Sequence, residues 1–134
     1  MQGSRTWAFA VQRIYRKVGM RELFDDILSV EGIRGLILFS FNGDLIFKNY
    51  NHTAAEEDKI QGLRRFVNSL AGIRETDLIF TKGRLYVRRT EIGYLVVVMG
   101  LFVPIAMMRL QCDILLPSLK SAFTKKGLRR LFKR

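Results

Sequence analysis

The chain has 134 residues, of which 49% are hydrophobic and 26% charged; these proportions indicate one globular domain and exclude an intrinsically disordered chain. The single Cys excludes an internal disulfide framework, and one Cys with one His excludes a closed zinc site of the Cys/His type. The net charge of +11 sits at the two ends, since residues 1–21 carry five basic residues, residues 120–134 carry seven, and neither segment has an acidic one. A nucleic-acid-binding fold usually spreads its basic residues over one face of the body, so this distribution argues against one.

The N-terminal part of the sequence predicts two helices. The first is a short helix ahead of Gly19, indicated by apolar residues at helical spacing: Trp7, Val11, Ile14, Tyr15 and Val18. The second ends at Gly32 and is indicated by Leu23, Phe24, Ile27 and Leu28. Arg13, Arg16 and Lys17 interrupt the apolar stretch that a secretory signal would need, so a cytoplasmic protein is expected.

Two strands are predicted next, over residues 36–41 and 45–50. Both runs are apolar and rich in residues that favour strands, and Asn42 and Gly43 lie between them. This pair predicts a type I′ turn, which requires positive φ at both central positions. The two runs should therefore form a tight β-hairpin.

A helix is predicted over residues 54–71. Thr53 followed three residues later by Glu56 is a capping box, in which each side chain satisfies a backbone donor of the first turn. Gly72 is a natural residue to end the helix. Its apolar stripe consists of Ile60, Leu63, Phe66, Val67 and Leu70.

Three further strands are expected over residues 78–81, 84–89 and 94–99. Lys82 and Gly83 separate the first two, and a short turn over residues 90–93 leads to the third. Residues 36–41 and 94–99 are apolar on both alternating faces, which is typical of strands covered on both sides. Residues 84–89 alternate apolar with charged side chains, so one face of that strand should be wetter.

The last predicted helix begins at Pro104, which is well suited to the first helical position. Pro117 should kink or end it, because proline lacks the amide hydrogen and clashes with the preceding turn. Its inner stripe consists of Ile105, Met108, Cys112, Leu115, Leu116 and Leu119. The expected fold class is α+β.

This order of elements, with these turns, resembles the Roadblock/LC7 family, which includes dynein light-chain roadblock subunits, MglB-type bacterial regulators and related Ragulator subunits. The resemblance covers roughly residues 20–119. It is carried by residues 27–39, which read as helix, short glycine-containing link and strand, by the turn at 42–44, and by the later apolar runs 85–87 and 94–98. Longin and profilin-like domains share parts of this layout, but a longin domain more often starts with a strand, whereas here a helix comes first.

The resemblance implies a five-stranded antiparallel sheet in the order 2-1-5-4-3, with the middle helix on one face and the terminal helices on the other. It also implies a homodimer, or a heterodimer with another Roadblock-like subunit, in which the third strands pair at their edges and the middle helices pack side by side. An uncharged edge strand is independently a pairing liability unless it is covered. The residues nominated for this interface are Ile60, Leu63, Val67, Leu78, Ile79 and Phe80.

The function that the resemblance implies is a non-catalytic scaffold that binds and regulates a small Ras-like GTPase, as MglB-type dimers do. The outer polar side of the middle helix would meet the GTPase through Lys59, Arg64, Arg65 and Asn68. Arg64 or Arg65 could serve as an arginine finger, but nothing in the sequence selects either. No cofactor or metal is expected, and an enzyme is the least supported class.

For the other candidate residues, an ordinary structural role is the simpler interpretation. His52 reads as a turn residue, since there is no second His and no catalytic triad can be assembled from the spacing. Cys112 reads as a small buried hydrophobe. No phosphate-binding glycine motif is present. Residues 92–108 are uncharged and reach the lower length limit of a membrane span, but Gly100 and Pro104 divide them into a strand and the start of a helix.

The chain is therefore divided into a basic N-terminal extension (1–19, helical), a Roadblock/LC7-like domain (20–119) and a basic amphipathic tail (120–134). The tail carries apolar residues on one helical side and basic residues elsewhere, and can act as an accessory contact on a GTPase, an acidic protein groove or anionic lipid, or serve only as a solubilising tail. A membrane-surface adaptor without a GTPase is the alternative function, and nucleic acid is disfavoured. The basic tail residues are Lys125, Lys126, Arg129, Arg130, Lys133 and Arg134.

Overall fold

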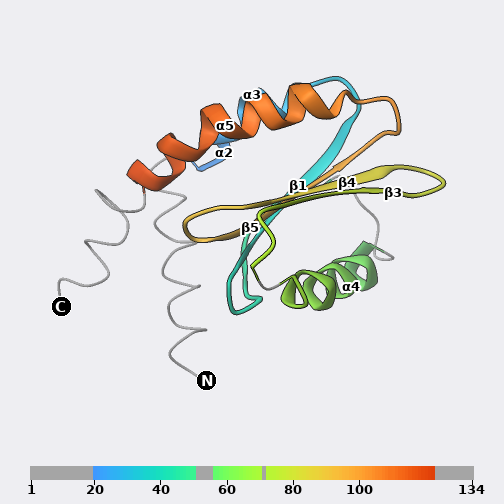
Figure 1. Cartoon of the computed structure of the whole chain (residues 1–134), viewed down its shortest axis with the longest axis horizontal. Coiled ribbons are helices and arrows are strands. Elements are labelled where there is room, and N and C mark those ends of the chain that lie inside the picture. Colours follow the sequence, from blue (N-terminus) through green and yellow to red (C-terminus); the bar gives the residue numbers. More distant parts are fainter. Residues whose placement is uncertain (1–19, 51–55, 71, 123–134) are drawn as a thin grey trace.

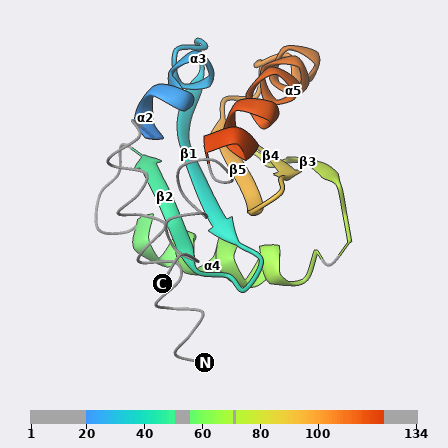
Figure 2. The ribbon, with the colours of Figure 1, turned by 90° about the vertical axis from the view of Figure 1, so that its left-hand side faces the viewer.

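The computed structural model describes residues 20–50, 56–70 and 72–122. Two helical layers enclose a sheet: α2, α3 and α5 cover one face and α4 covers the other (Figures 1 and 2). In chain order the elements are α2 (Met20–Leu23), α3 (Asp25–Leu28), β1 (Ile33–Ser40), β2 (Leu45–Tyr50), α4 (Glu56–Asn68), β3 (Glu75–Ile79), β4 (Arg84–Arg89), β5 (Gly93–Met99) and α5 (Ile105–Ser121). The helix expected ahead of Gly19, the capping residue Thr53, His52 and the basic tail residues lie outside the described residues.

Within the described residues the sheet has five antiparallel strands in the order β2-β1-β5-β4-β3. This confirms the strand order implied by the family resemblance. β1 pairs with β5 from Ile33↔Met99 to Ser40↔Gly93, so the first and last strands lie side by side in the centre. The two strands that are apolar on both faces, β1 and β5, are neighbours inside the sheet, where helices cover both sides.

Each face of the sheet carries its own apolar core. The face under α2, α3 and α5 buries Phe24, Leu36, Leu95, Met108 and their neighbours. The face over α4 buries a smaller set around Ile37, Phe39, Val67, Leu70 and Val96. The alternation of side chains along β1 and β5 divides their apolar residues between the two cores.

The β1–β2 hairpin forms where it was predicted, but its turn is not of type I′. Gly43 has a φ of +86°, whereas Asn42 has no positive φ. The loop is longer than two residues: the amide of Gly43 donates to the carbonyl of Ser40 at 2.9 Å, and the amide of Ser40 donates to the carbonyl of Asp44 at 2.8 Å. A turn followed by one glycine in the left-handed region serves the same purpose with a single positive φ.

Two strands begin earlier than their apolar runs suggested. β1 starts at Ile33 and not at 36, since Ile33 and Gly35 already pair with β5. β3 covers Glu75–Ile79 instead of 78–81, because Glu75 and the following residues pair with β4 in continuous register. The polar beginning of β3 therefore belongs to the sheet, and Phe80 follows the end of the strand.

Of the two outcomes expected at Pro117, a kink or the end of the last helix, the second is wrong. α5 continues through Pro117 to Ser121. Pro117 is exposed, so its ring faces away from the core, and the buried residues Leu115 and Leu119 hold the helix against the sheet on either side of it. Their packing compensates for the one backbone hydrogen bond that proline removes. Pro104 lies one position before the helix, with an extended ψ of 126°.

The run 92–108 divides as expected into β5 and the start of α5. No helix among the described residues is both long and apolar enough to cross a membrane.

Candidate interaction surfaces

β3 is one of the two edge strands of the sheet, and among the described residues nothing pairs with its outer edge. Two large apolar side chains are exposed there: Ile79 is 68% exposed and Phe80, just past the strand end, is 54% exposed. Leu78 is half-buried. An open edge with exposed apolar side chains is a template for pairing with another strand.

α4 brings some of its nominated residues to the surface and others to the core. Val67 is only 1% exposed and packs on its own sheet, which corrects its nomination as a dimer-contact residue. Leu63 is half-buried against the same core. For Lys59 and Ile60 the structure describes the helical backbone but not the side chains.

The polar residues nominated on α4 differ in their surroundings. Arg65 and Asn68 are exposed. Arg64 is half-buried, and its buried Nε has no hydrogen-bond partner among the described residues. Asn68 lies against the β1–β2 turn, with its Oδ1 2.7 Å from where a Cβ on Gly43 would be. The side of α4 away from the sheet is thus polar.

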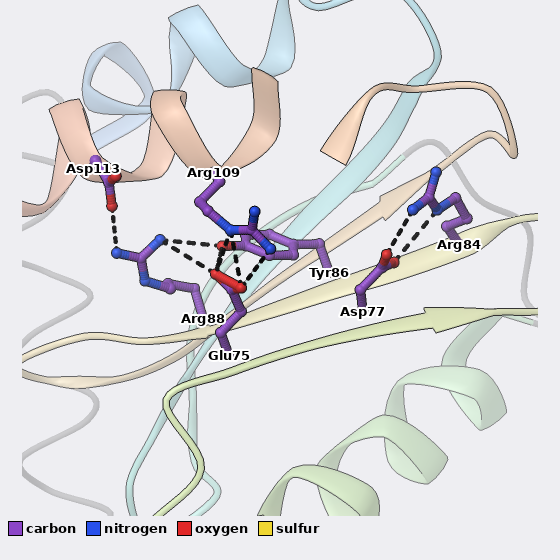
Figure 3. A network of polar contacts seen from close by, with 7 residues as sticks. All are labelled: Glu75, Asp77, Arg84, Tyr86, Arg88, Arg109 and Asp113. Carbon is purple, nitrogen blue, oxygen red and sulfur yellow. Dashed lines mark hydrogen bonds and ion pairs between the residues drawn. The ribbon is translucent and has the colours of Figure 1, made fainter. Parts of the chain in front are cut away.

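The polar face of β4 is not left to solvent, because side chains of α5 and β3 bond to it (Figure 3). Arg109 of α5 donates to the two carboxylate oxygens of Glu75 at 2.8 to 3.0 Å. The hydroxyl of Tyr86 donates to the same carboxylate at 2.8 Å. The hydrogen bonds from Arg109 hold the pKa of Glu75 below its ordinary value.

Arg88 is the most deeply buried charge of this set, with its side chain 5% exposed. It donates one hydrogen bond to Asp113 of α5 and another, at 3.1 Å, to the hydroxyl oxygen of Tyr86. Burial opposes the charge on Arg88, but these hydrogen bonds outweigh it and raise the pKa of Arg88 above its ordinary value. Burial raises the pKa of Tyr86 to about 12. We call these five residues, Glu75, Tyr86, Arg88, Arg109 and Asp113, the α5 network.

A second link holds the tip of the β3–β4 hairpin. Arg84 donates to Asp77 across the strand pair at 2.6 Å. The same guanidinium donates to the carbonyls of Val103 at 3.1 Å and Leu101 at 3.3 Å, in the loop between β5 and α5. Besides its backbone pairing with β4, the edge strand is therefore held to the rest of the subunit by ionic contacts.

The ion pair of Glu75 gives a pH-dependent contribution to stability. Because the folded state lowers the pKa of Glu75, the carboxylate stabilises the protein above pH 4.5 and the stabilisation is lost as the pH falls through the lowered pKa. We expect Glu75→Gln to lower the free energy of unfolding by about 1 kcal/mol at pH 7, since the pair is partly screened by solvent. In urea titrations the difference should shrink as the pH falls below 4.5, and a difference that is undiminished at acidic pH would contradict it.

The outer face of α5 is apolar and uncovered by the described residues. Met107, Leu110 and Ile114 recur at helical spacing and are 41%, 56% and 58% exposed. The loop before the helix adds Phe102, which is 95% exposed. Sequence analysis missed this surface because it placed only the inner stripe of the helix.

Cys112 lies on the inner side of α5 and is fully buried and free, as the sequence predicted. Burial raises the pKa of its thiol to about 12. We therefore expect the folded protein not to react with a thiol reagent such as 5,5′-dithiobis(2-nitrobenzoate). In about 6 M guanidinium, which unfolds the chain, one thiol per chain should react. Rapid labelling of the native chain would contradict this placement.

The described residues hold no group of three or more His, Cys, Asp or Glu side chains placed to bind a metal ion. The residues that do converge are those of the α5 network, which sequence analysis missed. Arg109 and Asp113 are one helical turn apart, and the alternation along β4 places Tyr86 and Arg88 on the same face. These two patterns were the available signals.

Comparison with known proteins supports the architecture. No family model and no curated protein sequence matches the chain. Among solved structures, the gliding protein MglB of Thermus thermophilus has a TM-score of 0.62 and 16% identity over 75% of this chain and 85% of that chain. Myxococcus xanthus MglB has a TM-score of 0.61 and 17% identity over 76% and 89%. A Roadblock/LC7 domain of Streptomyces avermitilis has a TM-score of 0.59 and 12% identity over 73% and 91%. The chain has the Roadblock/LC7 fold.

Proposed function

We propose that this chain, which has the Roadblock/LC7 fold, is a non-catalytic interaction module that dimerises and regulates a small Ras-like GTPase. The observation that carries the proposal is the open β3 edge, with Ile79 and Phe80 exposed, in a fold shared with MglB. Pairing of two such edges would bury this apolar surface and place two α4 helices next to each other. The partner would be either a second copy or another Roadblock-like subunit.

In this proposal the GTPase meets the polar outer side of α4. Arg65 and Asn68 are exposed there, and Arg64 is half-buried beside them. Regulation would follow from binding one nucleotide state more tightly, because a ligand shifts a conformational equilibrium only through differential affinity.

The proposal is tested by titrating the full chain into purified Ras-like GTPases from the same genome, beginning with any encoded beside it. Each GTPase is loaded with GDP or with a non-hydrolysable GTP analogue, and binding is measured by calorimetry. We expect one GTPase to bind in one nucleotide state at least about tenfold more tightly, a difference of about 1.4 kcal/mol. Arg65→Glu should weaken this binding, whereas Arg21→Glu, an equally exposed site on α2, should not.

Equal affinity for both nucleotide states, or no binding to any Ras-like GTPase, would overturn the proposal. The accessory role of the basic tail is tested separately with a chain ending at residue 122, because α5 extends to Ser121 and Leu119 is buried in the core. Loss of GTPase binding in this truncation would make the tail part of the contact. If the full chain binds no GTPase but floats with vesicles, and the truncated chain does not float, the alternative of a membrane-surface adaptor is favoured.

A further inference from the structure

A basic depression of about 870 Å³ lies where the end of β4 and the β4–β5 turn meet the C-terminal half of α5. Neither the proposed dimer edge nor the outer side of α4 contributes to it. Its charged lining residues are Arg74, Arg88, Arg89, Glu91, Asp113 and Lys120.

Two of the four basic residues already have carboxylate partners. Arg88 is hydrogen-bonded to Asp113. The ammonium nitrogen of Lys120 lies 3.7 Å from a carboxylate oxygen of Glu91. Both acidic residues of the lining are thereby used, and no carboxylate of residues 20–50, 56–70 or 72–122 pairs with Arg74 or Arg89.

The two remaining arginines are neighbours. The amide of Arg89 donates to the carbonyl of Arg74 at 2.8 Å, which continues the β3–β4 register beyond the pair Glu75↔Arg88. Like charges directly opposite each other destabilise an antiparallel pair, so this arrangement favours an anion between them. The guanidinium of Arg89 is also held 5.1 Å above the centre of the Phe41 ring.

The same depression has an apolar part. Phe41, which is 45% exposed, lines it together with Leu116 and Pro117 of α5. An inorganic anion would bind the arginines and leave this apolar surface exposed to solvent. A ligand with both carboxylates and a large apolar side chain would use both parts.

We propose that this depression binds an acidic segment of a partner protein, with carboxylates on Arg74 and Arg89 and an apolar side chain against Phe41, Leu116 and Pro117. Charge complementarity supports this occupant, because both carboxylates of the lining are already paired and Arg74 and Arg89 supply two further positive charges. A concave site suits an inserted segment better than a flat membrane surface. The site is separate from the surfaces used in the proposed GTPase regulation, so each can fail alone.

The test measures fluorescence anisotropy of a labelled peptide in which Asp and Glu alternate with Leu and Phe, titrated with the full chain at physiological salt. The pocket variant Arg74→Gln/Arg89→Gln is compared with the matched variant Arg21→Gln/Lys82→Gln, which removes the same charge elsewhere. We expect the pocket variant to bind at least about tenfold more weakly and the matched variant to stay within about twofold of the unmodified chain. Arg74→Gln alone, which disturbs no contact of the Phe41 ring, should weaken binding about threefold or more.

Two further arms fix the class of ligand. A peptide with Asn and Gln in place of Asp and Glu, and one with Ser in place of Leu and Phe, should each bind at least about tenfold more weakly. Equal weakening by the two double variants would assign binding to net charge and overturn the proposal. Absence of binding to the acidic peptide would overturn it as well. So would binding to phosphatidylserine vesicles that is lost in the pocket variant while peptide binding is unaffected.

Discussion

Replacing Gly93 by alanine should destabilise the protein by more than about 3 kcal/mol, because there is no room for a methyl group between the two central strands. A Cβ at this position would lie 1.8 Å from the carbonyl oxygen of Phe39 and 2.8 Å from the Cα of Ser40, both of them backbone atoms of β1. Backbone atoms cannot move aside as a flexible side chain can. The strands would have to separate at the Ser40↔Gly93 pair, which is next to the buried pair Phe39↔Tyr94.

Gly62→Ala is the matched control, since it makes the same chemical change where nothing lies within 4 Å of the new Cβ. Gly62 is inside α4, and alanine there should raise the free energy of unfolding by about 1 kcal/mol. Both variants are measured by urea denaturation. A Gly93→Ala protein as stable as the unmodified chain would show that β1 and β5 do not approach each other as described. A destabilised Gly62→Ala protein would indicate that another chain packs on α4 at that position.

The central part of the fold was predictable because local and long-range preferences agree there. β1 and β5 are apolar on both faces, and both lie in the middle of the sheet under two helical layers. The hairpin at Asn42 and Gly43 was also predictable as a hairpin, because glycine supplies the positive φ that it needs. The type of turn was not predictable, since the sequence does not show how many residues lie between the last paired residues of the two strands.

The beginning of β3 shows what sequence patterns cannot supply. Glu75, Thr76 and Asp77 are polar, and Glu and Asp are poor strand formers, so the apolar run from 78 onward marked the strand too late. These residues are held in the sheet by Arg109 and Arg84, the first of which lies on a helix 34 residues away. Such ionic contacts depend on the packing of α5 over the sheet, which is not encoded in any local period.

Candidate surface residues were predictable only in part. Ile79 and Phe80 are exposed, as expected for residues at the unpaired edge of a sheet. Val67 is buried because the apolar stripe of a helix packs on the sheet that the helix covers, and the residues used there do not face a partner. The apolar outer face of α5 and the basic depression arise from side chains that several elements bring together.

The dimer proposal makes its sharpest prediction at the β3 edge: Phe80→Lys should convert a dimer into a monomer. Phe80 is 54% exposed beside the open edge, so lysine should leave the subunit folded. In a dimer paired through β3, however, the lysine ammonium would be partly desolvated and the apolar contact made by Phe80 would be lost. We expect the dissociation constant to rise on the order of 100-fold.

The measurement is sedimentation equilibrium, in which the unmodified chain should have twice the 15.5 kDa mass of a single chain and Phe80→Lys should have the single mass. Ile114→Lys is the matched control, because Ile114 is 58% exposed on α5, in the helical layer on the opposite face of the sheet from α4. Dissociation by Ile114→Lys alone would place the interface on the outer face of α5 instead. If the unmodified chain and Phe80→Lys are both monomers, the β3 edge does not pair with a second copy, and a heterodimer becomes the form of the proposal to test. If both are dimers, β3 pairing is wrong, because a lysine at position 80, just past the end of β3, removes an apolar contact on which that interface depends.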